Sequence, residues 1–410
     1  MSTPLVTIVT PSFNQGNFIR ATIESVLSQD YPNLEYIIMD GGSKDETASV
    51  AKDYSSRLTF ISEQDRGQSH AINKGFQMAR GSILAWLNSD DLYLPGTVSK
   101  AVDAFNQAPA AGAIYGEGYL IDRHGNTTSR FPCTEPFNLW KLVHLSDYIL
   151  QQTVYFRKDV LDRVGYLDED LHYIMDWDIL VRIGMRYPLM YIPEYMGCLR
   201  EYAEAKTFAG GGRRANEIRK MLHRHTGMRI APGYVVYGLE TYQKLWCSQI
   251  ERACGPMKPV ARKLQTAVRL ATGSIIVRTI RDSQGLYSDG WAGRVLRYML
   301  PPQGKTIAIE GTLPEWPKLA GQTLQIHANG RWLGDLMPPN GDFQLNVEVP
   351  AELRGQVLHL KIRASKWLMP GRFTLHGDRR RLAYLVKAIR WVDEAPDLTE
   401  SLVQPAHIGI

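Results

Sequence analysis

Residues 5–10 read LVTIVT and residues 34–40 read LEYIIMD, and each of these apolar, β-branched runs leads into a polar turn. Runs of this kind predict strands that are buried on both faces of a sheet. Between them, residues 18–28 carry apolar side chains at helical spacing. A strand, a helix and a second strand in this order predict an α/β domain with a mostly parallel, Rossmann-like sheet.

The same alternation continues along the chain. A helix is predicted at 47–54, a strand at 58–63, a helix at 69–80 and a fourth strand at 82–88. Ligands bind beyond the carboxyl ends of the strands in such sheets. We therefore expect the polar loops that follow the four strands to converge on one site. These loops are residues 11–14, 40–45, 63–68 and 88–91.

The fourth strand ends in WLNSDD, residues 86–91. Two adjacent carboxylates suit a hard cation such as Mg²⁺ or Mn²⁺, which prefers oxygen ligands and bridges phosphates. Asp90 and Asp91 are therefore candidate metal ligands. The alternative is a solvated acidic turn or a helix cap.

Asp40 ends the second strand and is followed by two glycines, which let a flat ligand approach the backbone. A carboxylate at this place can accept a hydrogen bond from the imide N–H of a nucleobase. The alternative role for Asp40 is that of a helix cap. The segment EQDRGQSHAINKGF, residues 63–76, adds Asp65, Asn73 and Lys74, and Lys74 could equally be a solvated helix charge.

Three segments together resemble a family 2 glycosyltransferase with the GT-A fold, over roughly residues 4–225. They are the stretch from TIVTPSFNQGNF to DGGSKDET, then DRGQSHAINKGF, and then LAWLNSDDLYLPG. The resemblance implies that a nucleotide-sugar donor binds here, and that Asp90 and Asp91 hold a metal on its diphosphate. Asn88 stands where the family commonly has Asp. The residues implied in donor binding are Pro11, Ser12, Phe13, Asp40, Asp65, Asn73, Asn88 and Asp90.

The segment LHYIMDWDILVRIG, residues 171–184, resembles the family's catalytic-base segment, and this makes Asp176 the base. Met175 replaces the Glu that precedes this Asp in many members. Inverting sugar transfer needs one carboxylate to take the proton of the acceptor hydroxyl. The alternative is that Asp176 and Asp178 cap the helix. Weaker candidates for the acceptor or donor pocket are Gln151 and Gln152, which open a predicted strand, Trp177, Asp178, Arg200 and Lys206.

The composition excludes several classes of protein. A net charge of +5 without a dense basic stripe disfavours a nucleic-acid binder. Four scattered cysteines and the lack of an N-terminal signal pattern favour the cytoplasm. No apolar run is long enough for a transmembrane helix. The basic, amphipathic stretch 256–281 leaves two roles open: peripheral contact with the inner face of the plasma membrane, or ordinary packing with a solvated basic face.

Beyond Pro301 and Pro302 the sequence changes to short segments of alternating apolar and polar residues, which predict the strands of a β-sandwich. The predicted domains are 1–225, the transferase domain; 226–300, a helical and basic linker; 301–395, the sandwich; and 396–410, a tail. Trp316, Trp332 and Trp367 would serve either sugar binding or the sandwich core.

These features predict an inverting glycosyltransferase that uses Mn²⁺ or Mg²⁺. It would move a sugar from a UDP- or dTDP-sugar to a glycan or lipid-linked glycan acceptor, in bacterial surface polysaccharide biosynthesis. One alternative is a non-catalytic scaffold that binds nucleotide sugars or carbohydrate. A nicotinamide-dependent oxidoreductase is disfavoured because PSFNQGN, not G-x-G-x-x-G, follows the first strand. The oligomeric state is open.

Overall fold

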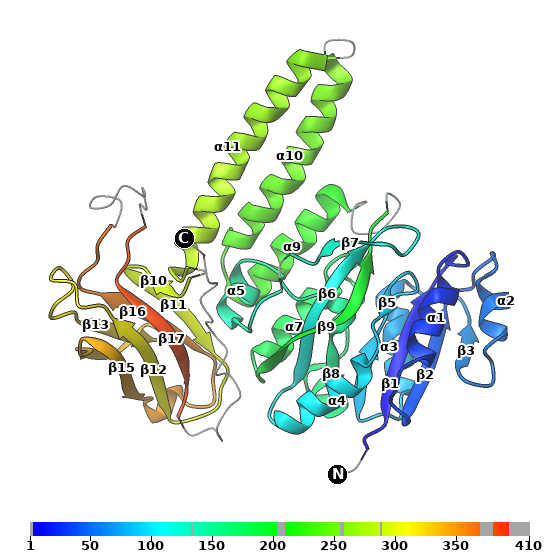
Figure 1. The fold of residues 1–410 in the computed structure, drawn as a ribbon, viewed down its shortest axis with the longest axis horizontal. Helices are drawn as coiled ribbons and strands as arrows, with labels where there is room; N and C mark the ends of the chain where they lie inside the picture. The colour runs from blue at the N-terminus through cyan, green and yellow to red at the C-terminus, as the bar shows by residue number, and fades with distance from the viewer. Residues whose placement is uncertain are drawn as a thin grey trace. The chain divides into compact units, whose positions relative to one another are not determined.

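A computed structural model describes residues 3–132, 134–202, 210–254, 258–287, 289–369 and 380–392. The chain divides into two compact units. The N-terminal unit comprises Met1–Phe137 and Asp147–Met221, and the C-terminal unit comprises Asn138–Ser146 and Leu222–Ile410. Figure 1 labels their helices and strands.

The described part of the N-terminal unit contains a nine-stranded sheet in the order β3-β2-β1-β4-β8-β6-β9-β5, with β7 paired to β6. Its first half is parallel and is formed by the predicted strands. These are β3 (Thr59–Ser62), β2 (Leu34–Asp40), β1 (Val6–Ser12) and β4 (Ile83–Trp86). The remaining strands are β5 (Leu92–Tyr93), β6 (Ala113–Ile121), β7 (Thr127–Arg130), β8 (Tyr155–Arg157) and β9 (Leu189–Arg200).

The second half of this sheet is mixed, so the expectation of a mostly parallel sheet was wrong there. Strand β8 runs antiparallel to both β4 and β6, and β6 pairs with β9 in parallel. The apolar pattern of a strand shows that it is buried but not which way it runs. The GT-A-like fold itself is confirmed, with a mixed α/β sheet.

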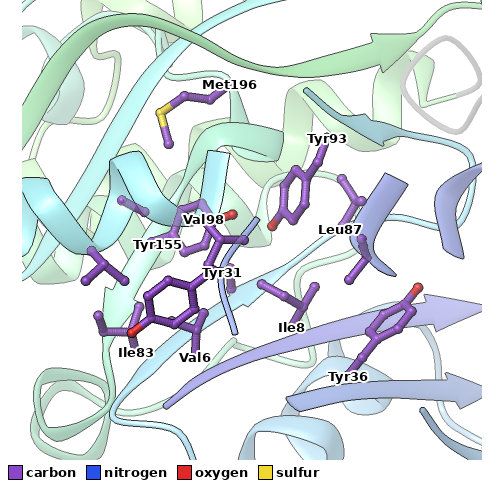
Figure 2. Close-up of a cluster of buried hydrophobic side chains, with 14 of the residues drawn as sticks. Val6, Ile8, Tyr31, Tyr36, Ile83, Leu87, Tyr93, Val98, Tyr155 and Met196 are labelled. Atoms are coloured by element: carbon purple, nitrogen blue, oxygen red, sulfur yellow. The ribbon is translucent and has the colours of Figure 1, made fainter. Parts of the chain in front are cut away.

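Helices cover both faces of the sheet (Figure 1). Under one face lies an apolar core to which α1 (Ile19–Leu27), α2 (Thr47–Lys52) and α4 (Thr97–Gln107) contribute. Figure 2 shows part of this core, including Ile8, Tyr36 and Tyr155. Against the opposite face, Phe76 of α3 (Gln68–Met78) meets the stacked rings of Trp86 and Phe156. Helices α6 (Lys158–Val164) and α7 (Met175–Gly184) follow β8 in the chain.

The C-terminal unit contains the predicted sandwich of two antiparallel sheets, whose inner faces share one core. One sheet has the order β10 (Trp291–Ala292), β17 (Tyr384–Trp391), β12 (Thr306–Leu313) and β15 (Gly341–Glu348). The other has the order β11 (Val295–Leu300), β16 (Leu358–Ala364), β13 (Leu324–Ala328) and β14 (Arg331–Leu336). The strands of the sandwich thus begin at Trp291, ahead of the expected start at Pro301.

Helices precede the sandwich in this unit. The short α5 (Leu139–His144) belongs to it, and α9 (Gly211–Thr226) leads into the unit along the chain. Helices α10 (Pro232–Cys254) and α11 (Lys258–Gln284) pair side by side as a long hairpin (Figure 1). None of the described helices is both long and apolar enough to cross a lipid bilayer. The predicted tail, 396–410, lies outside the described residues.

Candidate active site

The loops after β1, β2 and β3 meet at the carboxyl edge of the sheet. The strand register places Ser12 beside Asp40 and Asp40 beside Ser62. The Gly41 N–H donates to the Ser12 carbonyl at 2.8 Å, and the Glu63 N–H donates to the Asp40 carbonyl at 2.9 Å. The parallel strands therefore bring these loops together, as their sequence pattern predicts.

The Asp40 carboxylate is buried and braces these loops against one another. Its Oδ2 accepts from the backbone N–H groups of Gly42 and Ser43 and from the Ser62 hydroxyl, at 3.2, 3.0 and 2.6 Å. Its Oδ1 accepts from the Ser43 hydroxyl. Both oxygens are thus engaged within the protein, so Asp40 is better placed to shape the loops than to bind a base directly.

An exposed aromatic ring lies close to the glycine that follows Asp40. The Phe13 ring is 61% exposed. Gly41 lies between this ring and Asp65, since a Cβ atom at position 41 would come within 2.7 Å of Asp65 Oδ2 and 3.2 Å of the Phe13 ring. Asp65 Oδ1 accepts from the Gly67 N–H at 2.7 Å. Phe13, Gly41 and Asp65 therefore form an aromatic platform with a carboxylate at its side, which we call the Phe13 platform.

Asp91 is held inside the protein and is 1% exposed. Its Oδ2 accepts from Gln152 Nε2 at 2.6 Å and Asn88 Nδ2 at 3.0 Å, and its Oδ1 accepts from the Arg200 N–H at 2.9 Å. Burial, together with the neighbouring Asp90 charge, raises the pKa of Asp91 to about 7. The structure thus does not support Asp91 as a metal ligand, because its oxygens already fix the end of β4.

Asp90 is oriented differently from its neighbour. One oxygen, Oδ2, accepts from the Tyr202 hydroxyl at 2.7 Å, and the Tyr202 ring packs on Phe18 with centroids 5.1 Å apart. Burial raises the pKa of Asp90, while the Tyr202 hydrogen bond and the Arg200 charge oppose this shift. Tyr202 was missed as a site residue at the sequence level, where its segment was expected to contribute Arg200 and Lys206.

Arg200 is buried and has a structural role, so its predicted contact with phosphates is not supported. Its Nε donates to the Asp90 carbonyl at 2.6 Å, and its Nη1 donates to the carbonyls of Asp122 and Arg123 at 3.0 Å each. The guanidinium also stacks 5.1 Å from the Phe18 ring centroid. Lys206 lies outside the described residues.

Gln151 and Gln152 lie in a 3₁₀ turn, Gln151–Thr153, and not at the start of a strand as predicted. Gln151 Nε2 donates to the Trp86 carbonyl at 2.9 Å, while Gln152 Nε2 holds Asp91. Gln152 Oε1 is buried and has no hydrogen-bond partner among the described residues. The two amides therefore support the strand end that carries Asp90.

Helix α3 draws the segment that carries Asp176 toward this site. At its start, Gln68 Nε2 donates to Asn88 Oδ1 at 2.7 Å, and the Ser69 hydroxyl donates to the Leu171 carbonyl at 3.2 Å. Asn73 exchanges two hydrogen bonds with the Leu167 backbone. Asn73 thus anchors the loop before α7, and the structure does not support its predicted contact with the donor.

Asp176 lies in the first turn of α7, where the helix dipole favours an anion. Its Oδ1 accepts from the Trp177 N–H at 2.9 Å, while the N-cap position itself is held by Ile174. Asp147 is a second acidic residue here that sequence reasoning missed. Burial raises the pKa of Asp147 well above its usual range, and the Asp176 charge adds to this effect while Arg214 opposes it.

Trp177 and Asp178 belong to the interior, so their predicted pocket roles are not supported. Trp177 is buried in the core. Asp178 is 0% exposed and pairs with Arg182 at 2.7 Å. Arg182 in turn donates to the carbonyls of Val164, Gly165 and Tyr166, so this pair fixes α7 against the end of α6.

The site offers limited protein ligands for a divalent cation. No group of three His, Cys, Asp or Glu side chains among the described residues could hold a metal by itself. Mg²⁺ commonly rests on one or two carboxylates and completes its shell with substrate phosphates and water. A partly buried Asp90, with Asp91 withdrawn, fits that limited role.

Residues 7–162 match the family model described as glycosyl transferase family 2. The N-terminal unit carries a family 2 glycosyltransferase domain. A glycosyltransferase of Rickettsia prowazekii is 30% identical over 187 residues, which are 43% of this chain and 57% of that protein. The chondroitin synthase of Escherichia coli is 33% identical over 129 residues, 31% of this chain and 19% of the relative.

The chain was also compared with solved structures. A mannosyltransferase of Pyrobaculum calidifontis, solved in complex with GDP-Man and Mn²⁺, has a TM-score of 0.46 and 19% identity, with 68% of this chain and 85% of that chain covered. The present chain spans little more than half the length of the first curated relatives it matches, at 57% of each.

Proposed function

We propose that the protein transfers a sugar, with inversion, from a nucleotide-sugar donor to a glycan or lipid-linked glycan acceptor. The observation that carries this proposal is the position of Asp90 and Asp176. They come from distant segments. In support, Gln68 bonds Asn88, two residues before Asp90, and the adjacent Ser69 bonds Leu171, in the loop before the helix that carries Asp176. The family 2 domain supports the reaction class.

Asp176 is the proposed base. As the acceptor oxygen attacks the anomeric carbon, the carboxylate takes the hydroxyl proton, and the nucleoside diphosphate leaves from the opposite face. Asp147 lies close enough to Asp176 for the Asp176 charge to add to the effect of burial on the pKa of Asp147, so the two acidic groups interact. Asp90 would hold a Mn²⁺ or Mg²⁺ ion, which neutralises charge on the leaving diphosphate when bound.

The proposed donor is a UDP- or dTDP-sugar. A pyrimidine ring can stack on the exposed Phe13 ring, which lies near Asp65 across the buried Gly41. The Asp65 carboxylate can then accept the imide N–H that uracil and thymine both carry. A thermal-shift screen with Mn²⁺ should show stabilisation by UDP or dTDP above GDP and ADP. Phe13→Ala should weaken this stabilisation, because it removes the stacking surface.

The test of catalysis is an assay of donor turnover with Mn²⁺. Asp176→Asn should lower the turnover rate by about 10²–10⁴-fold, because it removes the base, and should leave nucleotide affinity unchanged. Asp170→Asn is the matched control, since this exposed carboxylate lies in the turn that precedes α7. Equal turnover in all three proteins would refute the assignment of Asp176. Absence of turnover in the wild type, with nucleotide binding intact, would favour the scaffold alternative.

We further propose a bacterial surface polysaccharide as the product, and the name of the E. coli relative, chondroitin synthase, supports this class. A cytoplasmic location with contact at the inner membrane face accompanies it.

Gln243 and Cys247 of α10 face Thr272 and Gln265 of α11. In a pair of antiparallel helices, the residue just before each inward-facing position lies on the same side of the hairpin. The exposed apolar side chains on that side are Tyr242 and Trp246, and Leu264 with Val260 one turn before it.

This apolar side, together with the exposed cations Arg262, Lys263 and Arg269, suits the surface of an anionic bilayer. The full chain should sediment with vesicles that contain phosphatidylglycerol and remain in solution with pure phosphatidylcholine. Trp246→Ser combined with Leu264→Ser should abolish sedimentation. Self-association of the wild type that the double variant removes, without vesicle binding, would instead identify this side as a contact between copies.

A further inference from the structure

The sheet β11-β16-β13-β14 has an outer face of unusual charge. Strand β16 alternates strictly: Leu358, Leu360 and Ile362 are buried, while the intervening side chains are exposed. The exposed residues are His359, Lys361 and Arg363. Because side chains alternate along a strand, these three point away from the sandwich core.

The register extends this pattern across all four strands. Arg297 of β11 is paired with Lys361, Lys361 with His327 of β13, and His327 with Trp332 of β14. Neighbouring strands are about 4.8 Å apart, so Arg297, Lys361 and His327 lie in one row, and Trp332 continues it where the register of β13 and β14 shifts. We call Arg297, Lys361, His327 and Trp332 the outer row. Arg363 lies in the adjacent row, next to Gln325.

The basic side chains of this face form no ion pair within the described part of the chain. This holds for Arg297, Lys361 and Arg363, although Arg297 donates one hydrogen bond to the Ser283 carbonyl. The other sheet of the same sandwich behaves differently. There Lys387 pairs with Asp342 at 2.6 Å, and Arg390 pairs with Glu310 at 2.7 Å.

The row ends in an aromatic ring that is held open to solvent. Trp332 is 59% exposed, and its indole N–H donates to Asp335 Oδ1 at 3.0 Å. This hydrogen bond limits rotation of the ring and also engages the carboxylate next to the row. An exposed, oriented indole offers an apolar face to the C–H groups of a pyranose ring.

We propose that this face binds an acidic glycan, one that carries uronate carboxylates along its chain. Lys361 and Arg363 would bind the carboxylates, with Arg297 beside them, and Trp332 would stack on a sugar ring. Charge-assisted pairs between guanidinium or ammonium groups and carboxylates are strong and directional. The choice of a glycan over another polyanion rests on the proposed glycosyltransferase function. The site would hold the acceptor chain while its end is extended elsewhere.

The experiment is calorimetric titration of the full chain, without donor, with hyaluronan oligosaccharides and with dextran as the uncharged control. Hyaluronan should bind and dextran should not, and affinity should fall as salt rises. Lys361→Gln combined with Arg363→Gln should lower hyaluronan affinity at least tenfold, and Trp332→Ala should lower it by a smaller factor. Lys387→Gln combined with Arg390→Gln, on the other sheet, is the matched control and should change nothing.

Three results would overturn the proposal: no binding of hyaluronan, equal loss in the control variant, or tighter binding of single-stranded DNA than of hyaluronan. Because no donor is present, the outcome does not depend on turnover. Asp176→Asn should bind hyaluronan as the wild type does. If the protein binds hyaluronan but transfers no sugar, only the proposed transferase function is refuted, and the glycan-binding proposal stands.

Discussion

Asp90 and Asp91 are adjacent in the sequence and have different surroundings. Asp91 is enclosed by donors from Gln152, Asn88 and the Arg200 backbone, whereas Asp90 meets the Tyr202 hydroxyl. The sequence alone cannot separate the two carboxylates. The hydrogen-bond donors that distinguish them come from segments 61 and 109 residues away from Asp91. A local sequence pattern cannot predict such distant partners.

Asp91→Asn should therefore act on stability. An amide at this position would direct an N–H group toward existing donors, so we expect the free energy of unfolding to fall by about 1–3 kcal/mol. Urea unfolding at pH 7.5 measures this change, and Mn²⁺-dependent nucleotide affinity should stay within about threefold of wild type. A stable variant that has lost metal-dependent binding would show that Asp91 is a ligand after all.

At the scale of elements, local sequence patterns predicted which strands and helices form but not the direction in which a strand runs in the sheet. The strands and helices up to β4 were predicted because their apolar periods are clear. The antiparallel direction of β8 was not, since it depends on its place between β4 and β6. The close packing of one element against another also could not be predicted from the sequence. Helix α3 lies so near β1 that a Cβ atom at Gly75 would come within 2.5 Å of Val9 Cγ1.

Gly75→Ala tests this close approach. Alanine favours helix by about 1 kcal/mol, but the collision with a buried strand should outweigh that gain and lower the free energy of unfolding by about 1–3 kcal/mol. Gln77→Ala, at an exposed position of the same helix, should be neutral or slightly stabilising. Equal stability of the two variants would mean that α3 moves freely over the sheet.

His144 at the end of α5 predicts a pH dependence in the C-terminal unit. Burial lowers the pKa of His144 to about 4, with the Trp140 carbonyl opposing and the charges of His359 and Arg297 assisting. The unfolded chain then takes up a proton near pH 6.5, before the folded chain does. The contribution of neutral His144 to the free energy of unfolding is fully present above pH 6.5. It is lost as the pH falls toward 4, by roughly 3 kcal/mol in all.

Thermal unfolding at pH 7.5 and pH 5 measures this dependence. His144→Phe keeps a ring against Trp140 and cannot titrate, so its melting temperature should fall less on acidification than that of the wild type. His124→Gln, at an exposed turn, should behave as the wild type does. The same acid-induced loss in all three proteins would exclude His144 as the cause.

At the scale of the whole molecule, the chain joins a family 2 glycosyltransferase domain to a helical hairpin and a β-sandwich. The change of pattern near Pro301 identified the sandwich, and the ordered motifs up to residue 91 identified the transferase. Which face of the sandwich is charged could not be seen in advance, because it depends on the pairing of Arg297 and Lys361 across strands 64 positions apart in the sequence. The central proposal nevertheless concerns the first unit: Asp90 holds the metal on the donor diphosphate, and Asp176 takes the proton of the acceptor hydroxyl.

Electron paramagnetic resonance of Mn²⁺ tests that claim most directly, because it reports the fraction of free ion. In the wild type, we predict that the free Mn²⁺ signal falls when UDP or dTDP is added together with the protein, beyond the fall caused by nucleotide alone. Asp90→Asn should lose this additional fall, and Asp176→Asn should retain it. An Asp90→Asn variant that still binds Mn²⁺ with nucleotide as the wild type does would contradict the account.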